Sequence, residues 1–267
     1  MKIALMTHKG AVRKENQDAV FVSGIVRTGD MDGPEFYDLD FKGRPILLAV
    51  IDGMGGYEGG ALAAKIMAEV LAEEADKDVF GDHMDVNADE RALRGLFNEA
   101  VRRMNAEALK NPLLMDMGVT MAGVLLREKR ALAFNCGDCR TYRFSAGGLE
   151  RVTRDHSIVQ VLFEVEEIDE EEMRTHPKKN VVTSAVSANS QNLYEKFEIY
   201  VRGLSLFEGD SFFLCSDGVW EALSFQELTR LTAQGMPSSD AARELFDTLM
   251  AANCHDNVSF IWAGFTV

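Results

Sequence analysis

Two Asp-Gly pairs in the sequence each follow an apolar segment. Asp52-Gly53 comes directly after residues 46–51, and Asp217-Gly218 comes directly after residues 212–216. An Asp-Gly pair alone is an ordinary turn sequence. Here each aspartate ends a segment apolar enough to be a core strand, which would bring carboxylates together at strand ends. Because Mg²⁺ and Mn²⁺ prefer oxygen ligands, the pattern predicts a site for a hard divalent cation.

A third aspartate, Asp256, is followed by Asn257 and by the last apolar segment, residues 258–262. Turn or cap chemistry could explain any one of these aspartates, but it does not explain three of them at buried strand ends. The glycine-rich residues 53–60 could instead form a nucleotide-binding loop. Their spacing argues against it, because Glu58 stands where the dinucleotide fingerprint needs glycine and no Gly-Lys-Ser/Thr follows.

The composition restricts the class of protein. The chain has 267 residues, 46% of them hydrophobic, which is enough for a large core, and we expect a single domain over residues 1–267. A formal charge of −15 argues against nucleic acid or anionic membranes as partners. No apolar run approaches the roughly 18 residues that span a bilayer, and the first residues lack a signal-peptide pattern. We therefore expect a cytoplasmic protein.

Every cysteine lies close in sequence to an aspartate. The four cysteines are too few for a disulfide scaffold in a chain of this length. Cys136, Cys215 and Cys254 read as small buried hydrophobic residues. Cys139 follows a Gly-Asp turn, so we expect it to be partly exposed and open to mild oxidants.

The elements that must position these residues alternate between strands and helices. Apolar stripes at helical spacing predict helices around residues 63–71, 93–104 and 242–249. Short apolar or alternating segments, many with turn signals between them, predict antiparallel strands at residues 3–7, 19–22, 46–51, 120–126, 131–135, 141–144, 197–201, 211–215 and 258–265. The pattern indicates an α+β fold with helices packed outside a sheet or β-sandwich.

Residues 158–180 stand apart because of their charge. Seven acidic side chains lie between Glu164 and Glu172, followed by Arg174, His176 and two lysines. This much charge cannot join a core, so the segment is predicted to be helical and solvated. It could be a mobile flap beside a site or simply an acidic surface helix.

Seven short motifs occur in order along the chain. They are Arg-Lys-Glu-Asn-Gln-Asp at residues 13–18, Asp-Gly-Met-Gly-Gly at 52–56, Gly-Val-Thr at 118–120, Asn-Cys-Gly-Asp-Cys-Arg at 135–140, Thr-Arg-Asp-His-Ser at 153–157, Cys-Ser-Asp-Gly-Val-Trp at 215–220 and Asp-Asn at 256–257. Any one of them is weak, whereas seven in order are specific. In this order they resemble the bacterial metal-dependent protein phosphatases of type 2C, and the resemblance runs from about residue 7 to residue 265.

The resemblance implies a central antiparallel β-sandwich flanked by helices, with a metal cluster in a cleft at one end. Carried over by position, Asp52 would bridge two Mn²⁺ or Mg²⁺ ions. Asp217 and Asp256 would complete the first ion's ligands, and the carbonyl of Gly53 would serve the second.

Three further residues take outer roles in this resemblance. Asp18 would hold metal-bound water, Asp138 would join Asp217 at a third and weaker metal position, and Arg13 would bind phosphate. Two cations lower the pKa of a bridging water and neutralise the phosphate dianion that it attacks. Arg13, Asp52 and Asp217 are therefore the predicted catalytic residues.

The function implied is that of a hydrolase: a protein-serine/threonine phosphatase that acts on phosphorylated proteins in signalling and opposes a Ser/Thr protein kinase. Met54 stands where some relatives carry a histidine thought to protonate the leaving group, and lone histidines such as His156 and His255 are more often structural.

The alternative is a non-catalytic regulatory or partner-binding protein with a phosphatase-like fold. Five matched carboxylates favour the enzyme, because without metal their repulsion only costs stability.

Overall fold

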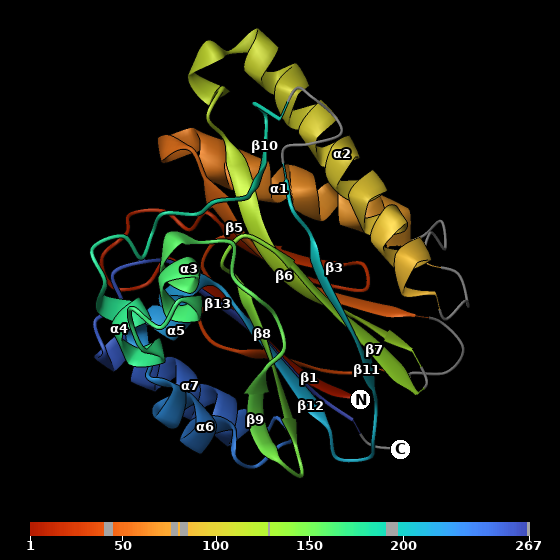
Figure 1. Cartoon of the computed structure of the whole chain (residues 1–267), viewed down its shortest axis with the longest axis vertical. Coiled ribbons are helices and arrows are strands. Elements are labelled where there is room, and N and C mark those ends of the chain that lie inside the picture. Colours follow the sequence, from red (N-terminus) through yellow and green to blue (C-terminus); the bar gives the residue numbers. More distant parts are fainter. Residues whose placement is uncertain (40–44, 76–79, 81–84, 128, 191–196, 266–267) are drawn as a thin grey trace.

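The computed structural model describes residues 1–39, 45–75, 80, 85–127, 129–190 and 197–265, which form two antiparallel sheets with helices outside them (Figure 1). This confirms the predicted α+β sandwich. The first sheet has the order β4 (Glu35–Asp38), β1 (Lys2–His8), β13 (Val258–Gly264), β12 (Ser211–Cys215), β8 (Arg140–Ser145) and β9 (Gly148–Arg151).

The second sheet contains the strand that carries Asp52. Its order is β11 (Tyr200–Ser205), β7 (Arg130–Cys136), β6 (Gly118–Arg127), β5 (Ile46–Met54), β2 (Asp18–Val22) and β3 (Ile25–Thr28), with β10 (Val186–Ser187) also paired to β6.

The central strands are buried on both faces, which explains why they read as continuous apolar runs. On β12, Phe212 and Leu214 pack into the core between the sheets. Phe213 and Cys215 point to the other face and pack against the helices that cover the first sheet. Alternate residues of a strand face opposite sides, so a strand between two apolar layers needs apolar residues at every position.

Helices cover the outer face of each sheet, as Figure 1 shows. On the second sheet lie α1 (Gly56–Ala75) and α2 (Val86–Lys110), and on the first lie α5 (Asp217–Ala222), α6 (Phe225–Thr232) and α7 (Ser239–Ala251). The remaining helices are η1 (Pro112–Leu114), α3 (Ile158–Glu164) and α4 (Glu170–Thr175). None of the helices in the described ranges is both long and apolar enough to cross a membrane.

Several elements differ from the sequence-based expectation. The strand predicted at residues 197–201 lies at Tyr200–Ser205, and the acidic segment forms two short helices, α3 and α4, with Met173 buried beneath them. Helices α5 and α6 were not predicted. A signal for α6 was present: Ser224 caps it and Glu227 bonds back to Ser224, the capping-box spacing of Ser and Glu three residues apart.

A buried ion pair joins helix α2 to strand β6. The guanidinium of Arg127 donates to both carboxylate oxygens of Asp89, at 2.7 and 2.9 Å, and to the carbonyl of Phe80 at 2.8 Å. Both side chains are more than nine-tenths buried. Removing one partner would leave the other charge buried without compensation.

We expect Asp89→Ala to lower the free energy of unfolding by about 3–5 kcal/mol, measured by urea denaturation. Glu90→Ala is the matched control, because Glu90 lies on the same helix turn and pairs with Arg94 at the surface, 3.1 Å away. It should change stability by less than about 1 kcal/mol. Equal small losses in the two variants would contradict a structural role for the buried pair.

Candidate metal centre

Strand ends from both sheets bring the predicted aspartates together. Asp18 at the start of β2 is paired across the sheet with Asp52 near the end of β5, and Asp52 is paired with Thr120 on β6. Asp217 follows β12 and begins α5. Asp256 comes just before β13, the strand paired to β12. The spacing of the Asp-Gly pairs therefore reflects strands that end at the same side of the sandwich.

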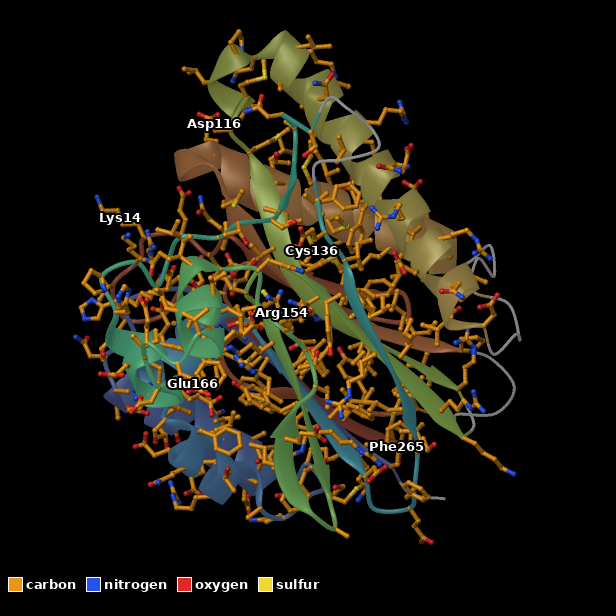
Figure 2. All side chains as sticks on the ribbon, viewed as in Figure 1. Lys14, Asp116, Cys136, Arg154, Glu166 and Phe265 are labelled. Atoms are coloured by element: carbon orange, nitrogen blue, oxygen red, sulfur yellow. The ribbon has the colours of Figure 1, made fainter. Side chains whose placement is uncertain are left out.

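A pocket of about 560 Å³ lies at these strand ends. Of the residues predicted to bind metal, it is lined by Asp52, Gly53, Asp138, Asp217 and Asp256, together with the predicted phosphate ligand Arg13. Val12, Lys14, Glu15, Gln17, Met54, Gly55, Gly56, Thr120, Asn180, Val182 and Asn257 complete the lining. Figure 2 shows Lys14 at the molecular surface, in the loop that also carries Arg13.

Asp18 lies behind the pocket wall and is 2% exposed. The hydroxyl of Ser216 donates to its Oδ2 at 2.8 Å, while its Oδ1 is buried with no hydrogen-bond partner among the described residues. The backbone N–H of Ser259 donates in turn to Ser216, and the Ser259 hydroxyl donates to Thr7. These hydroxyl side chains were not predicted from the sequence, although Ser259 interrupts an otherwise apolar strand.

The carboxylates are crowded in a setting that disfavours their charge. Burial raises the pKa of Asp52 well above its usual value, and the negative charges of Asp217, Asp18 and Asp138 raise it further. The pKa of Asp217 is also raised well above its usual value, first by burial and then by the negative charge of Asp138. Burial is also the largest cause that raises the pKa of Asp18 to about 6 and that of Asp138 to about 7.

This donor set fits a divalent cation. It consists of carboxylate and carbonyl oxygens, the ligands of Mn²⁺ and Mg²⁺, and it includes an unpartnered buried oxygen on Asp18. A positive charge in the pocket would relieve the repulsion that raises the pKa values. Within the described residues, however, no three His, Cys, Asp or Glu side chains lie close enough together to hold one ion as they stand.

The carboxylate of Asp256 is paired with an arginine at the pocket. Arg13 donates from Nε to Oδ1 of Asp256 at 2.9 Å and from Nη2 to Oδ2 at 2.6 Å, and this hydrogen bonding raises the pKa of Arg13. Asn257 fixes the loop that carries Arg13, because its side chain donates to the carbonyls of Lys9 and Glu15. A cation bound by Asp256 would compete with Arg13 for the same oxygens.

The expectation for Cys139 is wrong. Its side chain is fully buried, with Sγ 3.3 Å from the Thr120 hydroxyl, and burial raises the pKa of the thiol well above its usual value. A neutral, inaccessible thiol is a poor nucleophile. Cys136, Cys215 and Cys254 are buried as expected.

The model of the protein phosphatase 2C family matches residues 38–255, so the chain belongs to this family. It is 26% identical to the serine/threonine protein phosphatase PstP of Mycobacterium tuberculosis, over 98% of this chain but only 45% of the relative's length. It is 25% identical to the serine/threonine phosphatase stp of Listeria monocytogenes, over 98% of this chain and 94% of that protein. The fold also matches the catalytic domain of PstP in complex with two manganese ions, with a TM-score of 0.74, 23% identity and 99% of each chain covered.

The crowding of carboxylates predicts a pH-dependent stability for the metal-free protein. An aspartate in an unfolded chain has a pKa of about 3.9. Because the pKa of Asp52 is raised on folding, the folded state keeps its proton where the unfolded chain has lost it, and this group lowers stability as the pH rises. In chelator, Asp52→Asn should therefore raise the free energy of unfolding, and by more at pH 8 than at pH 5.

Urea denaturation at the two pH values measures this difference, and Asp247→Asn on the exposed side of α7 is the control. The control should shift stability little at either pH. A gain from Asp52→Asn that is absent, or that does not grow with pH, would show that Asp52 is not under repulsion.

Proposed function

We propose that this chain is a metal-dependent protein-serine/threonine phosphatase, which hydrolyses the phosphate monoester of phosphoserine and phosphothreonine in proteins. The observation that carries the proposal is the convergence of Asp52, Asp138 and Asp217 with Arg13 in one pocket at the strand ends. Negative charge confined in this way suits a cation, and the arginine suits the anion that the cation attracts. Family membership supports the same activity.

Asp52, Asp217, Asp256 and the Gly53 carbonyl are the proposed ligands of two divalent cations, Mn²⁺ or Mg²⁺. Asp138 is proposed to hold a third, weaker ion, and Asp18 to act from the outer shell. When bound, the cations supply an activated water and positive charge at the phosphate. The PstP catalytic domain forms a complex with two manganese ions, which supports this assignment by analogy.

The protein's own residues bind and orient the substrate in this proposal. Arg13 is half exposed at the pocket, and its planar guanidinium could grip two phosphate oxygens. Gly53 leaves no room for a side chain, since a Cβ there would meet the Gly60 carbonyl oxygen at 2.2 Å. Gly53 lines the pocket, so what it offers there is backbone.

The source of the proton for the leaving alkoxide is a separate question. Met54 lines the pocket and has no proton to give, and none of the described lining residues is a histidine. Water in the pocket is therefore the proposed proton donor.

Residues 158–180 are proposed to form a flap on a single domain that spans residues 1–267. Helix α4 packs against α5, the helix that begins at Asp217, and α3 packs against α4 (Figure 1). Asn180, the last residue of the segment, and Val182, two residues after it, line the pocket. Two of the seven acidic residues are paired, Glu164 with Arg154 and Glu171 with Arg174, so part of the segment's negative charge is offset.

Phosphorylated proteins are the proposed substrates, with a Ser/Thr protein kinase as the opposing enzyme in cytoplasmic signalling. The formal charge of −15 supports a partner other than nucleic acid. The alternative of a non-catalytic regulator has no specific observation in its favour. A scaffold would gain nothing from carboxylates whose repulsion opposes folding.

We expect Asp217→Asn to lower turnover at least about 100-fold with Mn²⁺, the scale for loss of one charge-stabilising group in an active site. Asparagine also suits the first turn of α5, so the fold should be kept. Hydrolysis of p-nitrophenyl phosphate and of a phosphothreonine peptide, with Mn²⁺ and then with chelator, measures the effect. Asp247→Asn should be as active as the wild type. Near-normal turnover of a folded Asp217→Asn protein would refute the proposed site.

A further inference from the structure

His156 lies where the chain enters the segment of residues 158–180, and its side chain is buried to 4% exposure. The imidazole Nδ1 accepts a hydrogen bond from the backbone N–H of Gly137 at 3.1 Å. The backbone N–H of His156 donates to the carbonyl of Gly137 at 2.8 Å. The backbone N–H and the carbonyl of Gly137 are therefore both hydrogen-bonded to His156.

His156 also belongs to the base of the segment. Its carbonyl accepts from the N–H of Thr183 at 2.8 Å, and Ile158 donates to the carbonyl of Val181 at 2.9 Å. Ser157 and Val182 form a bridge between these two bonds. The entry and exit of the segment are therefore joined by a short antiparallel ladder, and His156 is one of its members.

The residue after Gly137 is Asp138, whose side chain lines the pocket. Gly137 has a φ of +100°, and a Cβ there would meet the Thr120 Cβ at 2.3 Å, so only glycine fits at this turn. The indole N–H of Trp220 donates to the carbonyl of Asp138 at 3.0 Å. The turn is fixed on one side by Trp220 and on the other by His156.

The side chain of Asn135 also connects the Gly137 turn to the base of the 158–180 segment. The amide of Asn135 donates to the carbonyls of Gly137, at 3.0 Å, and of Arg154, at 2.8 Å. Arg154, labelled in Figure 2, lies in the stretch that leads into α3. The turn that carries Asp138 and the base of the segment are thus hydrogen-bonded to each other through both His156 and Asn135.

The Nδ1 bond requires a neutral imidazole with its proton on Nε2, because a protonated Nδ1 cannot accept. Burial lowers the pKa of His156, which favours this form, while the carboxylate of Glu198, 3.8 Å from Nε2, opposes the shift. Arg154 favours the neutral form and Asp155 opposes it.

We propose that His156 is a positioning residue, whose Nδ1 fixes the Gly137 peptide so that Asp138 is held at the pocket and is coupled to the base of the 158–180 segment. The proposal deepens the proposed function, on which its link to metal binding rests. It predicts that the acceptor atom matters, beyond the space that the side chain fills.

Two substitutions separate the acceptor from the volume. In His156→Asn, Oδ1 can occupy the place of Nδ1 and accept from Gly137. In His156→Leu, the volume is similar and the acceptor is gone. Thermal unfolding identifies the folded variants, and if the leucine protein does not fold, His156→Gln replaces it, since glutamine is polar but moves the acceptor away from the Nδ1 position.

The first readout is hydrogen exchange in the metal-free protein, at the amides of Gly137 and Thr183. We expect exchange about two- to tenfold faster in His156→Leu, the range for loss of one buried hydrogen bond, and near-wild-type exchange in His156→Asn. The second readout is calorimetric titration with Mn²⁺, where the leucine variant should bind more weakly and the asparagine variant should match the wild type.

The proposal would be overturned if both variants showed wild-type exchange and wild-type Mn²⁺ affinity. It would also be overturned if both variants lost protection from exchange and Mn²⁺ affinity to the same extent. In either case the Nδ1 acceptor would not be what positions the turn. Faster exchange without weaker Mn²⁺ binding would also overturn it, since Asp138 would not depend on the turn. Exchange in the metal-free protein does not depend on catalysis. A wild-type protein that hydrolyses no phosphate monoester would refute the proposed function and leave the exchange result to be read separately.

Discussion

Repulsion among the carboxylates crowded at the end of the sandwich is the constraint on which the rest of the site depends. Strand β5, which carries Asp52, and strand β12, which ends just before Asp217, are packed on both faces, by the core between the sheets and by the outer helices. A strand held in this way cannot move its end by more than small amounts, because protein cores are close-packed. The carboxylates therefore cannot relax apart, and a cation is the natural way to offset their charge.

The surroundings of these carboxylates supply hydrogen bonds more than counter-charge. Asp18 accepts from the Ser216 hydroxyl, and the backbone of Asp138 accepts from the indole of Trp220. Ser216 thus orients the Asp18 carboxylate and Trp220 holds the Asp138 backbone, and neither donor neutralises a charge. Among the residues that line the described pocket, Arg13 and Lys14 are the cationic ones, and Arg13 is paired with Asp256. Orientation without neutralisation is what a site for divalent cations requires.

Much of the fold could be predicted from the sequence, because its buried strands form continuous apolar runs and α2 has an apolar stripe at helical spacing. The aspartates at residues 52 and 217 could be found because each ends an apolar run. The pairings between residues within the site could not be predicted from the sequence. Arg13 and Asp256 are 243 residues apart, Asp18 and Ser216 are 198 apart, and His156 and Gly137 are 19 apart. No local pattern encodes such contacts, and the same is true of the contact between Cys139 and Thr120 on strand β6.

The most direct test of the metal centre is a crystal structure with Mn²⁺, in which anomalous scattering at the manganese edge locates the ions. We expect anomalous peaks in the pocket at the carboxylates of Asp52 and Asp217. We also expect that the oxygens of Asp256 contact an ion and that Arg13 has moved away from them. Saturating Mn²⁺ with no anomalous peak at these aspartates, or with the Arg13–Asp256 pair intact and ions bound only elsewhere, would contradict the proposed metal centre.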